Sequence, residues 1–309
     1  MRIFLIVAMF ASCLQAQEPA PPRYFEPEKA LRPEGTVVVL LGTGMPVANP
    51  RTSGPATAVV VRDRVFLFDA GPGVVRQLAA AGLPINGVTA AFITHLHSDH
   101  TLGYPDLIFT TWVMGRITPL SVYGPPGLKI MTDHLLAAWA EDIEVRVTGF
   151  ERNPRSGYSV DAHEIEPGVV YDQGGVRVTA FAVRHGSWKR AYGYRIDTPD
   201  RSIVISGDTA PSDELVRIAA GCDVLVHEVY PAVRLKPEKR PGGEFWVAYM
   251  RSFHTSDEEL GAIADKIRPK KLILHHIVRM GGTDEEVLAG VRRGGYTGEA
   301  VIGHDLERH

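Results

Sequence analysis

The chain has 309 residues, of which 45% are hydrophobic and 22% charged, and its formal net charge at pH 7 is −3. This composition is typical of a globular protein with a large core, and it excludes the strongly basic balance of many nucleic-acid-binding proteins. A local basic patch remains compatible with it.

The first sixteen residues have the pattern of a secretory signal peptide. Arg2 supplies one positive charge, residues 3–11 form an apolar run, and small residues lead to Ala16. The run is too short to cross a bilayer of roughly 30 Å as a helix. We therefore expect an exported protein, periplasmic or secreted, cut after Ala16 and without a transmembrane span. Lipoprotein anchoring through Cys13 is the less favoured alternative.

Residues 17–35 are rich in Pro and Glu, which predicts an extended lead-in to one folded domain at 36–309. The first half of that domain alternates apolar runs of strand length with helical spacing. It predicts strands at 36–41, 57–62, 65–69, 90–94 and 120–123, and helices at 74–81, 104–117 and 127–145. Residues 149–175 are polar and turn-rich, with strand-like patches.

The second half repeats the alternation. It predicts strands at 176–183, 192–197, 202–206, 223–226, 271–275 and 300–302, helices at 211–220, 256–267 and 284–293, and a long loop at 228–253. Because strands and helices alternate in both halves, we expect an α/β fold of two sheets with helices outside. A shared site would lie where strand ends from both halves meet.

A dense group of polar side chains follows the apolar run 90–93. His95, His97, Asp99 and His100 lie within six residues of one another. Neutral histidines pack poorly in a core, and a buried carboxylate needs a partner. A divalent cation satisfies both, because imidazole nitrogen and carboxylate oxygen are its natural ligands. The alternative is a solvated polar turn.

Three later residues could complete a metal site. His185, Asp208 and His276 each stand at the exit of an apolar strand. Functional side chains of such sheets gather at strand exits. We therefore expect these residues to meet the group at 95–100.

The pattern His-x-His-x-Asp-His at 95–100, with the three later residues, resembles the metallo-β-lactamase-fold hydrolases from about residue 36 onward. The stretches 41–44 (Leu-Gly-Thr-Gly), 226–228 (Val-His-Glu) and 253–256 (Phe-His-Thr-Ser) make it similar to the ribonuclease Z and arylsulfatase-like branch. This resemblance implies a four-layer αβ/βα sandwich of two mixed sheets with helices outside.

The resemblance also implies a dinuclear zinc centre, with Mn²⁺ or Fe²⁺ as other candidate ions. One ion would be held by His95, His97 and His185, the other by Asp99, His100 and His276, and Asp208 would bridge them. In the family the ligand lies two residues after the match of Leu274, which selects His276, whereas His275 is expected on the opposite face of its strand.

The chemistry implied is attack by an activated water. Two zinc ions lower the pKa of a shared water to about 7 and neutralise charge on substrate oxygens. Asp99 would orient or deprotonate that water as well as bind metal. In the ribonuclease Z pattern, His254 held by Glu228 would protonate the leaving oxygen. His227 is expected to be structural.

Four residues around His185 are candidates for binding substrate: Arg184, Trp188, Lys189 and Tyr192. A cation and an aromatic ring beside a metal centre would suit an anionic aryl ester. The alternative is a solvated loop with one packed Trp.

Ribonuclease Z often carries a long tRNA-gripping insertion between the matches of His185 and Asp208, where only 22 residues intervene here. We therefore expect a zinc hydrolase of a small anionic phosphodiester or sulfate ester, and nucleic acid is not the favoured partner. The alternative is a tRNA 3′-end endoribonuclease. A β-lactamase, lactonase or thioesterase would use the same metals, and a metal-binding protein without catalysis is the alternative outside enzymes. The resemblance leaves a homodimer open.

Overall fold

The structure is a computed structural model of the chain and describes residues 30–309. The expected signal peptide and most of the expected lead-in lie outside the described residues. Among residues 30–309, no helix combines the length and the apolar character that crossing a membrane would require.

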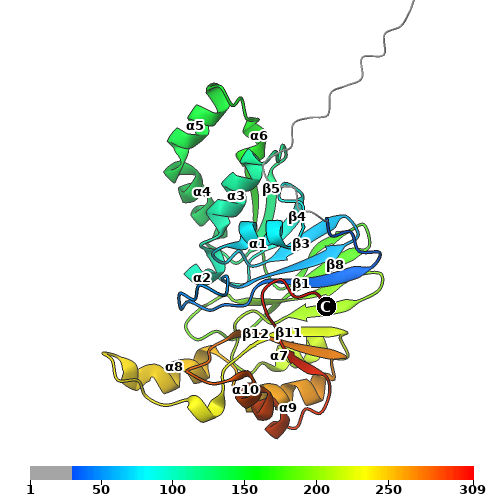
Figure 1. Cartoon of the computed structure of the whole chain (residues 1–309), viewed down its shortest axis with the longest axis vertical. Coiled ribbons are helices and arrows are strands. Elements are labelled where there is room, and N and C mark those ends of the chain that lie inside the picture. Colours follow the sequence, from blue (N-terminus) through cyan, green and yellow to red (C-terminus); the bar gives the residue numbers. More distant parts are fainter. Residues whose placement is uncertain (1–29) are drawn as a thin grey trace, which may run out of the picture.

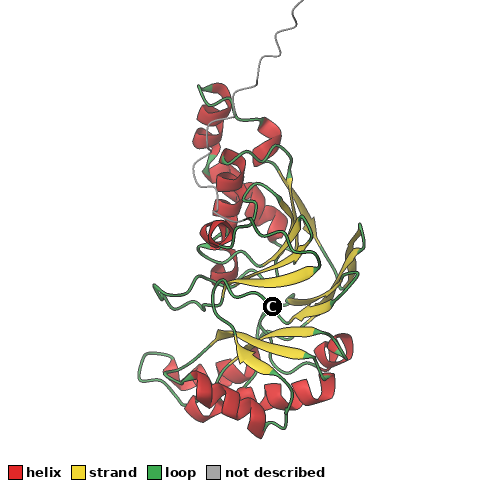
Figure 2. Ribbon diagram, turned by 45° about the vertical axis from the view of Figure 1, so that its right-hand side comes forward, coloured by secondary structure: helices red, strands yellow, loops and turns green. Residues whose placement is uncertain are grey.

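Two mixed β-sheets lie against each other, and helices cover their outer surfaces (Figure 1, Figure 2). Within residues 30–309 the first sheet contains, in spatial order, β1 (Thr36–Gly42), β2 (Ala56–Val61), β3 (Arg64–Phe68), β4 (Val88–Phe92), β5 (Leu120–Gly124) and β6 (Val160–Glu164). The second contains β13 (Ala300–Ile302), β12 (Lys271–Ile277), β11 (Val224–Val229), β10 (Ser202–Ile205), β9 (Tyr192–Asp197), β8 (Val176–Ala182) and β7 (Gly168–Gln173). Each sheet joins antiparallel pairs to parallel ones.

The helices form the two outer layers. Those of the first half are α1 (Val74–Ala80), α2 (Ser98–Thr101), α3 (Tyr104–Val113), α4 (Leu128–Ala138), α5 (Ala140–Thr148) and α6 (Arg155–Tyr158). Those of the second half are α7 (Asp213–Ala219), α8 (Trp246–Phe253), α9 (Asp257–Ile267) and α10 (Asp284–Arg293), with 3₁₀ turns η1 (Ala232–Arg234) and η2 (Gly243–Phe245). The expected αβ/βα sandwich is confirmed.

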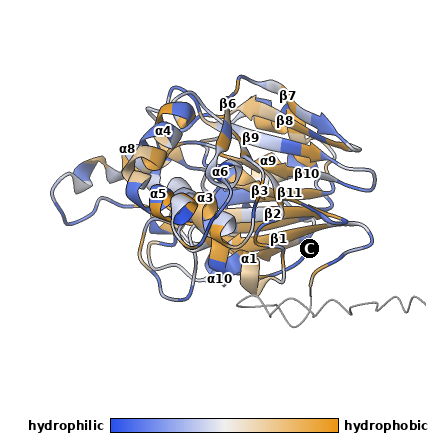
Figure 3. Ribbon diagram, turned by 90° about the horizontal axis from the view of Figure 1, so that it is seen from above, coloured by the Kyte–Doolittle hydropathy of each residue, from blue (hydrophilic) through white to orange (hydrophobic). Residues whose placement is uncertain are grey.

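The core between the sheets is rich in aromatic rings. Phe68 stacks on Phe92 with ring centroids 5.0 Å apart, and Tyr194 of β9 meets Phe92 edge-on at 5.6 Å. The Tyr194 hydroxyl donates to the carbonyl oxygen of Ile93 (2.7 Å). Figure 3 shows that hydrophobic residues concentrate in the strands. Buried aromatic area therefore joins the sheets directly beneath the loop that follows β4.

The free edge of the first sheet is covered by residues 305–309. The backbone N–H of Val38 donates to His309 O, and His309 N–H donates to Val38 O, both at 2.9 Å. The C-terminal segment lies along β1 in Figure 1. Pairing of this kind removes an exposed strand edge.

One expected helix, at 127–145, is wrong in its extent. It is interrupted at Trp139, which separates α4 from α5 and has φ −104° and ψ 21°. The Trp139 ring packs on Phe109 of α3 with centroids 5.3 Å apart. This tertiary contact fixes the indole at the break between the two helices. The helices α4 to α6 extend from one end of the sandwich (Figure 1).

The expected long loop at 228–253 is also wrong in part. It contains η1, η2 and the helix α8. Aromatic residues at 246, 249 and 253 have helical spacing, but the Pro, Gly and charged residues ahead of them hide the pattern. In the polar stretch 149–175, the strand-like patches are β6 and β7.

Candidate metal centre

Seven side chains converge where strands of both sheets end. His95 and His97 follow β4, Asp99 and His100 begin α2, and the others come from the ends of β8, β10 and β12. Their ligand-type atoms form two groups, each within 4.8 Å: His95, His97, His185 and Asp208, and Asp99, His100 and His276. The structure thus brings together all seven residues expected to bind metal.

In the first group, ring nitrogens face a common point. Nδ1 of His97 lies 2.9 Å from Nε2 of His95 and 3.1 Å from Nε2 of His185. Oδ2 of Asp208 lies 3.9 Å from the same nitrogen of His185. Burial lowers the pKa of His95 well below its usual value and that of His185 to about 4. Both rings are therefore neutral near pH 7, with lone pairs available for a cation.

In the second group, carboxylate oxygens alternate with imidazole nitrogens. Nε2 of His276 lies 3.2 Å from Oδ2 of Asp99, and Nε2 of His100 lies 3.5 Å from both this oxygen and Oδ1 of Asp208. His276 Nε2 is also 3.6 Å from Oδ2 of Asp208. Asp208 therefore touches both groups, as a bridging ligand would.

Electrostatics keep Asp208 ionised in spite of its burial. Burial alone would raise the pKa of this carboxyl, but the imidazoles of His276, His100 and His95 lower it well below its usual value. For His100, burial lowers the pKa, and the carboxylates of Asp208 and Asp69 raise it well above its usual value. Asp208 is therefore an anionic group surrounded by buried imidazoles.

Divalent metal ions fit this donor set. Nε2 of His100 is buried and has no hydrogen-bond partner among the described residues, although its other ring nitrogen is bonded to Asp69. Imidazole nitrogens and carboxylate oxygens in two adjoining groups are the ligands of transition-metal ions. A buried, orphaned ring nitrogen directed at two carboxylates is accounted for by a cation.

Asp69, which the sequence analysis did not select, orients this centre. It follows β3 with φ 59°, and its Oδ2 lies 2.8 Å from Nδ1 of His100. Its Oδ1 accepts the backbone N–H of Thr94 at 2.8 Å. Such a partner fixes the tautomer of a metal-binding imidazole. Its position at the exit of an apolar strand is the signal that could have found it.

The backbone also positions the ligands. His276 has φ 45°, and its N–H donates to Thr43 O at 3.1 Å. Thr43 is held in turn by Asp305, which accepts its N–H and its hydroxyl, both at 2.8 Å. Gly207 precedes Asp208 with φ 59°, and a Cβ there would lie 2.7 Å from Tyr192 O. A side chain at 207 would therefore displace the strand exit.

His254 and Glu228 form a buried pair beside the two groups. Nδ1 of His254 lies 3.3 Å from Oε2 of Glu228 and 4.0 Å from Oδ2 of Asp208. The other Glu228 oxygen accepts the N–H of Thr255 at 3.0 Å. Burial lowers the pKa of His254, but the Glu228 carboxylate outweighs it and raises the pKa overall. The pair can therefore hold a proton near the centre.

The four expected substrate residues have different positions. Trp188 Nε1–H donates to Nε2 of His97 at 2.8 Å. Trp188 and Lys189 both line a cleft of 490 Å³. Tyr192 is fully buried, and its hydroxyl donates to Ile165 O at 2.8 Å, which places it away from the centre. Arg184 is exposed and its backbone pairs with Ala210.

The two further histidines next to the centre are buried outside both ligand groups. Nδ1 of His227 lies 2.6 Å from Glu228 O. Burial lowers the pKa of His275 to about 3, and its backbone stands opposite Glu228 in the sheet. His275 is thus a neutral strand residue, and His276 carries the ligand nitrogen.

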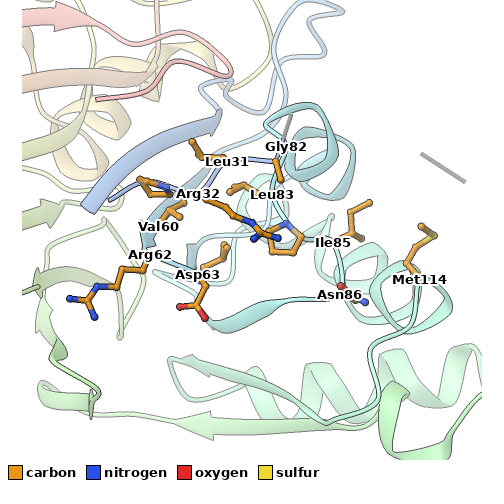
Figure 4. A pocket seen from close by; sticks show the side chains of 14 residues that line it. Leu31, Arg32, Val60, Arg62, Asp63, Gly82, Leu83, Ile85, Asn86 and Met114 are labelled. Atoms are coloured by element: carbon orange, nitrogen blue, oxygen red, sulfur yellow. The ribbon is translucent and has the colours of Figure 1, made fainter. Parts of the chain in front are cut away.

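A 170 Å³ pocket opens over the centre, and its lining includes Asp99, Asp208, His254 and His276. A larger cavity of 720 Å³ lies elsewhere, between residues 30–33 and the turn after α1 (Figure 4). Among the described residues that line it there is no histidine or cysteine. The chemistry-bearing side chains are therefore at the smaller pocket.

Comparisons with known proteins agree with this geometry. The family described as "Beta-lactamase superfamily domain" matches residues 64–277. A protein named Ribonuclease Z from Mycobacterium bovis (strain BCG / Pasteur) is 32% identical over 277 residues, which cover 88% of this chain and 96% of that protein.

Solved structures have the same fold. The metallo-β-lactamase fold protein YhfI from Bacillus subtilis matches with a TM-score of 0.67 and 18% identity, over 89% of this chain and all of that one. The short form of human tRNase Z matches with a TM-score of 0.65 and 22% identity, over 88% of this chain and 98% of that one.

Proposed function

The chain belongs to the β-lactamase superfamily domain family and is a hydrolase that acts on ester bonds, and on this premise we propose that it is a metal-dependent phosphodiesterase that cleaves RNA. The observation that carries the proposal is the likeness to a Ribonuclease Z along nearly the whole of that protein. A small anionic phosphodiester or sulfate ester, our first expectation from sequence, has no such support.

The short connection between His185 and Asp208 does not weigh against RNA. The 277 aligned residues correspond to 88% of this chain and 96% of the Mycobacterium bovis protein, which leaves no room for a long insertion within the match. A protein named Ribonuclease Z therefore lacks a long arm as well. The absence of a long arm led us to disfavour nucleic acid as a partner, but this chain and the Mycobacterium bovis protein share that absence.

Two zinc ions would occupy the proposed centre, with Mn²⁺ or Fe²⁺ as alternatives. His95, His97 and His185 would bind one, Asp99, His100 and His276 the other, and Asp208 both. When bound, the ions would lower the pKa of a water molecule and neutralise charge on the phosphate oxygens. Metal analysis of the purified protein should find about two ions per chain.

The remaining steps are assigned to side chains of this chain. Asp99, which lines the pocket, would orient the attacking water through its carboxylate. Attack at phosphorus breaks the bond to the leaving oxygen. His254, kept protonated by Glu228, would donate a proton to that oxygen, so that the leaving group departs as an alcohol.

A substrate panel tests the proposed function. One zinc-loaded preparation is compared on bis(4-nitrophenyl) phosphate, 4-nitrophenyl sulfate, a β-lactam and a precursor tRNA with a 3′ extension. We expect hydrolysis of the phosphodiester and cleavage of the RNA. Faster turnover of the sulfate or the β-lactam than of both phosphodiesters would overturn the proposal.

Export is a separate proposal that rests on Arg2, the apolar run 3–11 and the small residues before Ala16. Expression in a Gram-negative host, followed by fractionation and N-terminal sequencing, should recover a periplasmic chain that begins at residue 17. A cytoplasmic chain that begins at Met1 would refute export and leave the phosphodiesterase proposal intact.

A further inference from the structure

A groove continues the small pocket over the metal centre. It has a volume of 610 Å³ and runs between the loop after β1 and the segment that leads into α8. Met45, Trp246 and Val278 line both the pocket and the groove. A substrate whose phosphate sits at the centre would therefore place an adjoining group in the groove.

The wall of this groove begins a row of aromatic rings along α8. Trp246 stacks on Tyr249 with centroids 5.3 Å apart and planes at 14°, and Tyr249 stacks on Phe253 at 4.3 Å and 23°. Phe253 meets the metal-ligand candidate His185 edge-on at 4.9 Å. The row thus connects the groove to the centre through packed rings, which hold the indole in place.

The indole of Trp246 is also oriented by polar contacts. Its Nε1–H donates to Sδ of Met280 at 3.4 Å. The guanidinium of Arg240 lies over the ring, 5.5 Å from its centroid. A planar guanidinium on an indole occupies the position that a nucleobase takes on an aromatic platform. Arg240 itself is exposed, so that a base can replace it.

The groove combines apolar and charged residues in a way that fits a nucleotide. Met45 and Met280 supply polarisable thioethers beside the indole, and Arg240 and Arg279 supply positive charge. Each arginine also forms an ion pair, Arg240 with Glu238 and Arg279 with Asp284. Planar apolar surface and guanidinium groups together suit a base and its phosphate.

The position of His254 decides which nucleoside would enter. His254 lines the pocket over the centre but is not among the residues that line the groove. If His254 protonates the leaving oxygen, the group in the groove is on the side that keeps the phosphate. A nucleoside bound in the groove would therefore stay esterified to the phosphate after cleavage.

We propose that this groove is a nucleoside subsite: the base of the nucleotide that retains the cleaved phosphate stacks on Trp246, and Arg240 moves from the indole to a neighbouring phosphate. This inference rests on the proposed phosphodiesterase function and adds the substrate group that the site selects. Stacking on one aromatic side chain is worth about 1–3 kcal/mol per base, which is about five- to 150-fold in affinity.

The test compares three esters with the same leaving group: uridine 5′-(4-nitrophenyl phosphate), methyl 4-nitrophenyl phosphate and hexyl 4-nitrophenyl phosphate. In the zinc-loaded enzyme, kcat/KM for the uridine ester should exceed that for the methyl ester by about five- to 150-fold. Trp246→Ala should bring this ratio close to one, mainly through KM. Equal rates for the uridine and methyl esters, or a preference for the hexyl ester, would overturn the subsite.

The matched control is Phe245→Ala. Phe245 is the neighbouring aromatic residue, is 68% exposed, and lines neither the pocket nor the groove. It should leave both rates and their ratio unchanged. An equal loss of the ratio in this variant would mean that the end of α8, rather than the indole face, is responsible.

A binding measurement separates this inference from the proposed function. Calorimetry with uridine 5′-monophosphate should show binding that Trp246→Ala weakens about tenfold and Phe245→Ala retains. If no ester is hydrolysed but this binding pattern holds, the phosphodiesterase proposal fails and the subsite stands. If the methyl ester is hydrolysed and the nucleotide does not bind, the subsite is wrong and the function stands.

Discussion

The loop at 94–100 and the segment at 228–256 serve the same centre in opposite ways. The loop places His95, His97, Asp99 and His100 with one strand end and the short helix α2. The segment contributes Glu228 from a strand, His254 from the end of a helix, and the groove wall from α8. The residues of the first are neighbours in one loop, whereas those of the second come together only through the packing of distant elements.

This difference explains what the sequence could predict. Four ligand candidates within six residues form a pattern that needs no tertiary information, and His185, Asp208 and His276 could be found because each follows an apolar strand. The two-sheet architecture follows from the alternation of strands and helices. These inferences rely on periodicity and on strand exits.

The residues that sequence reasoning missed or placed wrongly depend on contacts across the fold. Asp69 acts through His100, 31 positions later. Tyr192 stands close to His185 in the chain, but strand alternation turns its ring into the core. Trp246 is separated from the ligands in sequence and reaches the pocket only because α8 packs beside it. Neither proximity in the chain nor composition reports such placements.

The largest expected effect tests whether ligands distant in sequence contribute as much to metal binding as the group at 95–100. In Asp208→Ala the carboxylate that touches both ligand groups is removed. We expect fewer than about two metal ions per chain and a loss of at least about a thousandfold in hydrolysis of bis(4-nitrophenyl) phosphate. Mass-spectrometric metal analysis and steady-state kinetics measure both.

His134→Ala is the control for this variant, because His134 is exposed on α4 and lies outside both ligand groups. It should keep full metal content and activity. Two ions retained in Asp208→Ala would contradict the bridging role of Asp208. Metal binding would then depend mainly on the loop at 94–100.

The next effect concerns the 228–256 segment. His254→Ala should slow cleavage of RNA, which has a poor leaving group, by about 10²- to 10⁴-fold. Hydrolysis of a nitrophenyl ester needs no proton donor and should change far less. Single-turnover rates on both substrates measure this difference between RNA and the nitrophenyl ester. Equal slowing of the two would assign His254 a structural role.

The pH profile of RNA cleavage sharpens this assignment. Glu228 raises the pKa of His254, and a proton donor must be protonated, so the rate should fall as pH rises through the raised pKa. Glu228→Gln removes the carboxylate and lowers that pKa, which should move the alkaline limb to lower pH. An alkaline limb at the same pH in Glu228→Gln would show that Glu228 has no part in the proton transfer.

The smallest of these effects tests whether the group at 95–100 can bind metal tightly without support from Asp69. Asp69→Asn keeps the shape of the side chain but weakens its hold on His100, so metal affinity should fall about 10- to 100-fold. Competition with a chromophoric chelator measures it. Asp63→Asn, in the exposed turn between β2 and β3, is the control. Unchanged affinity in Asp69→Asn would show that the loop at 94–100 needs no outside support.

The pairing of β1 with residues 305–309 also has a consequence for biosynthesis. Thr43 and Asp305 lie 262 positions apart, so a ribosome that adds about 5–20 residues per second exposes the edge of the first sheet for tens of seconds before its partner exists. Among the described strands, β1 is the first to be made and one of the last to be paired along both edges. Until residues 305–309 have been made, β1 therefore presents an unpaired edge to which strands of other chains can add.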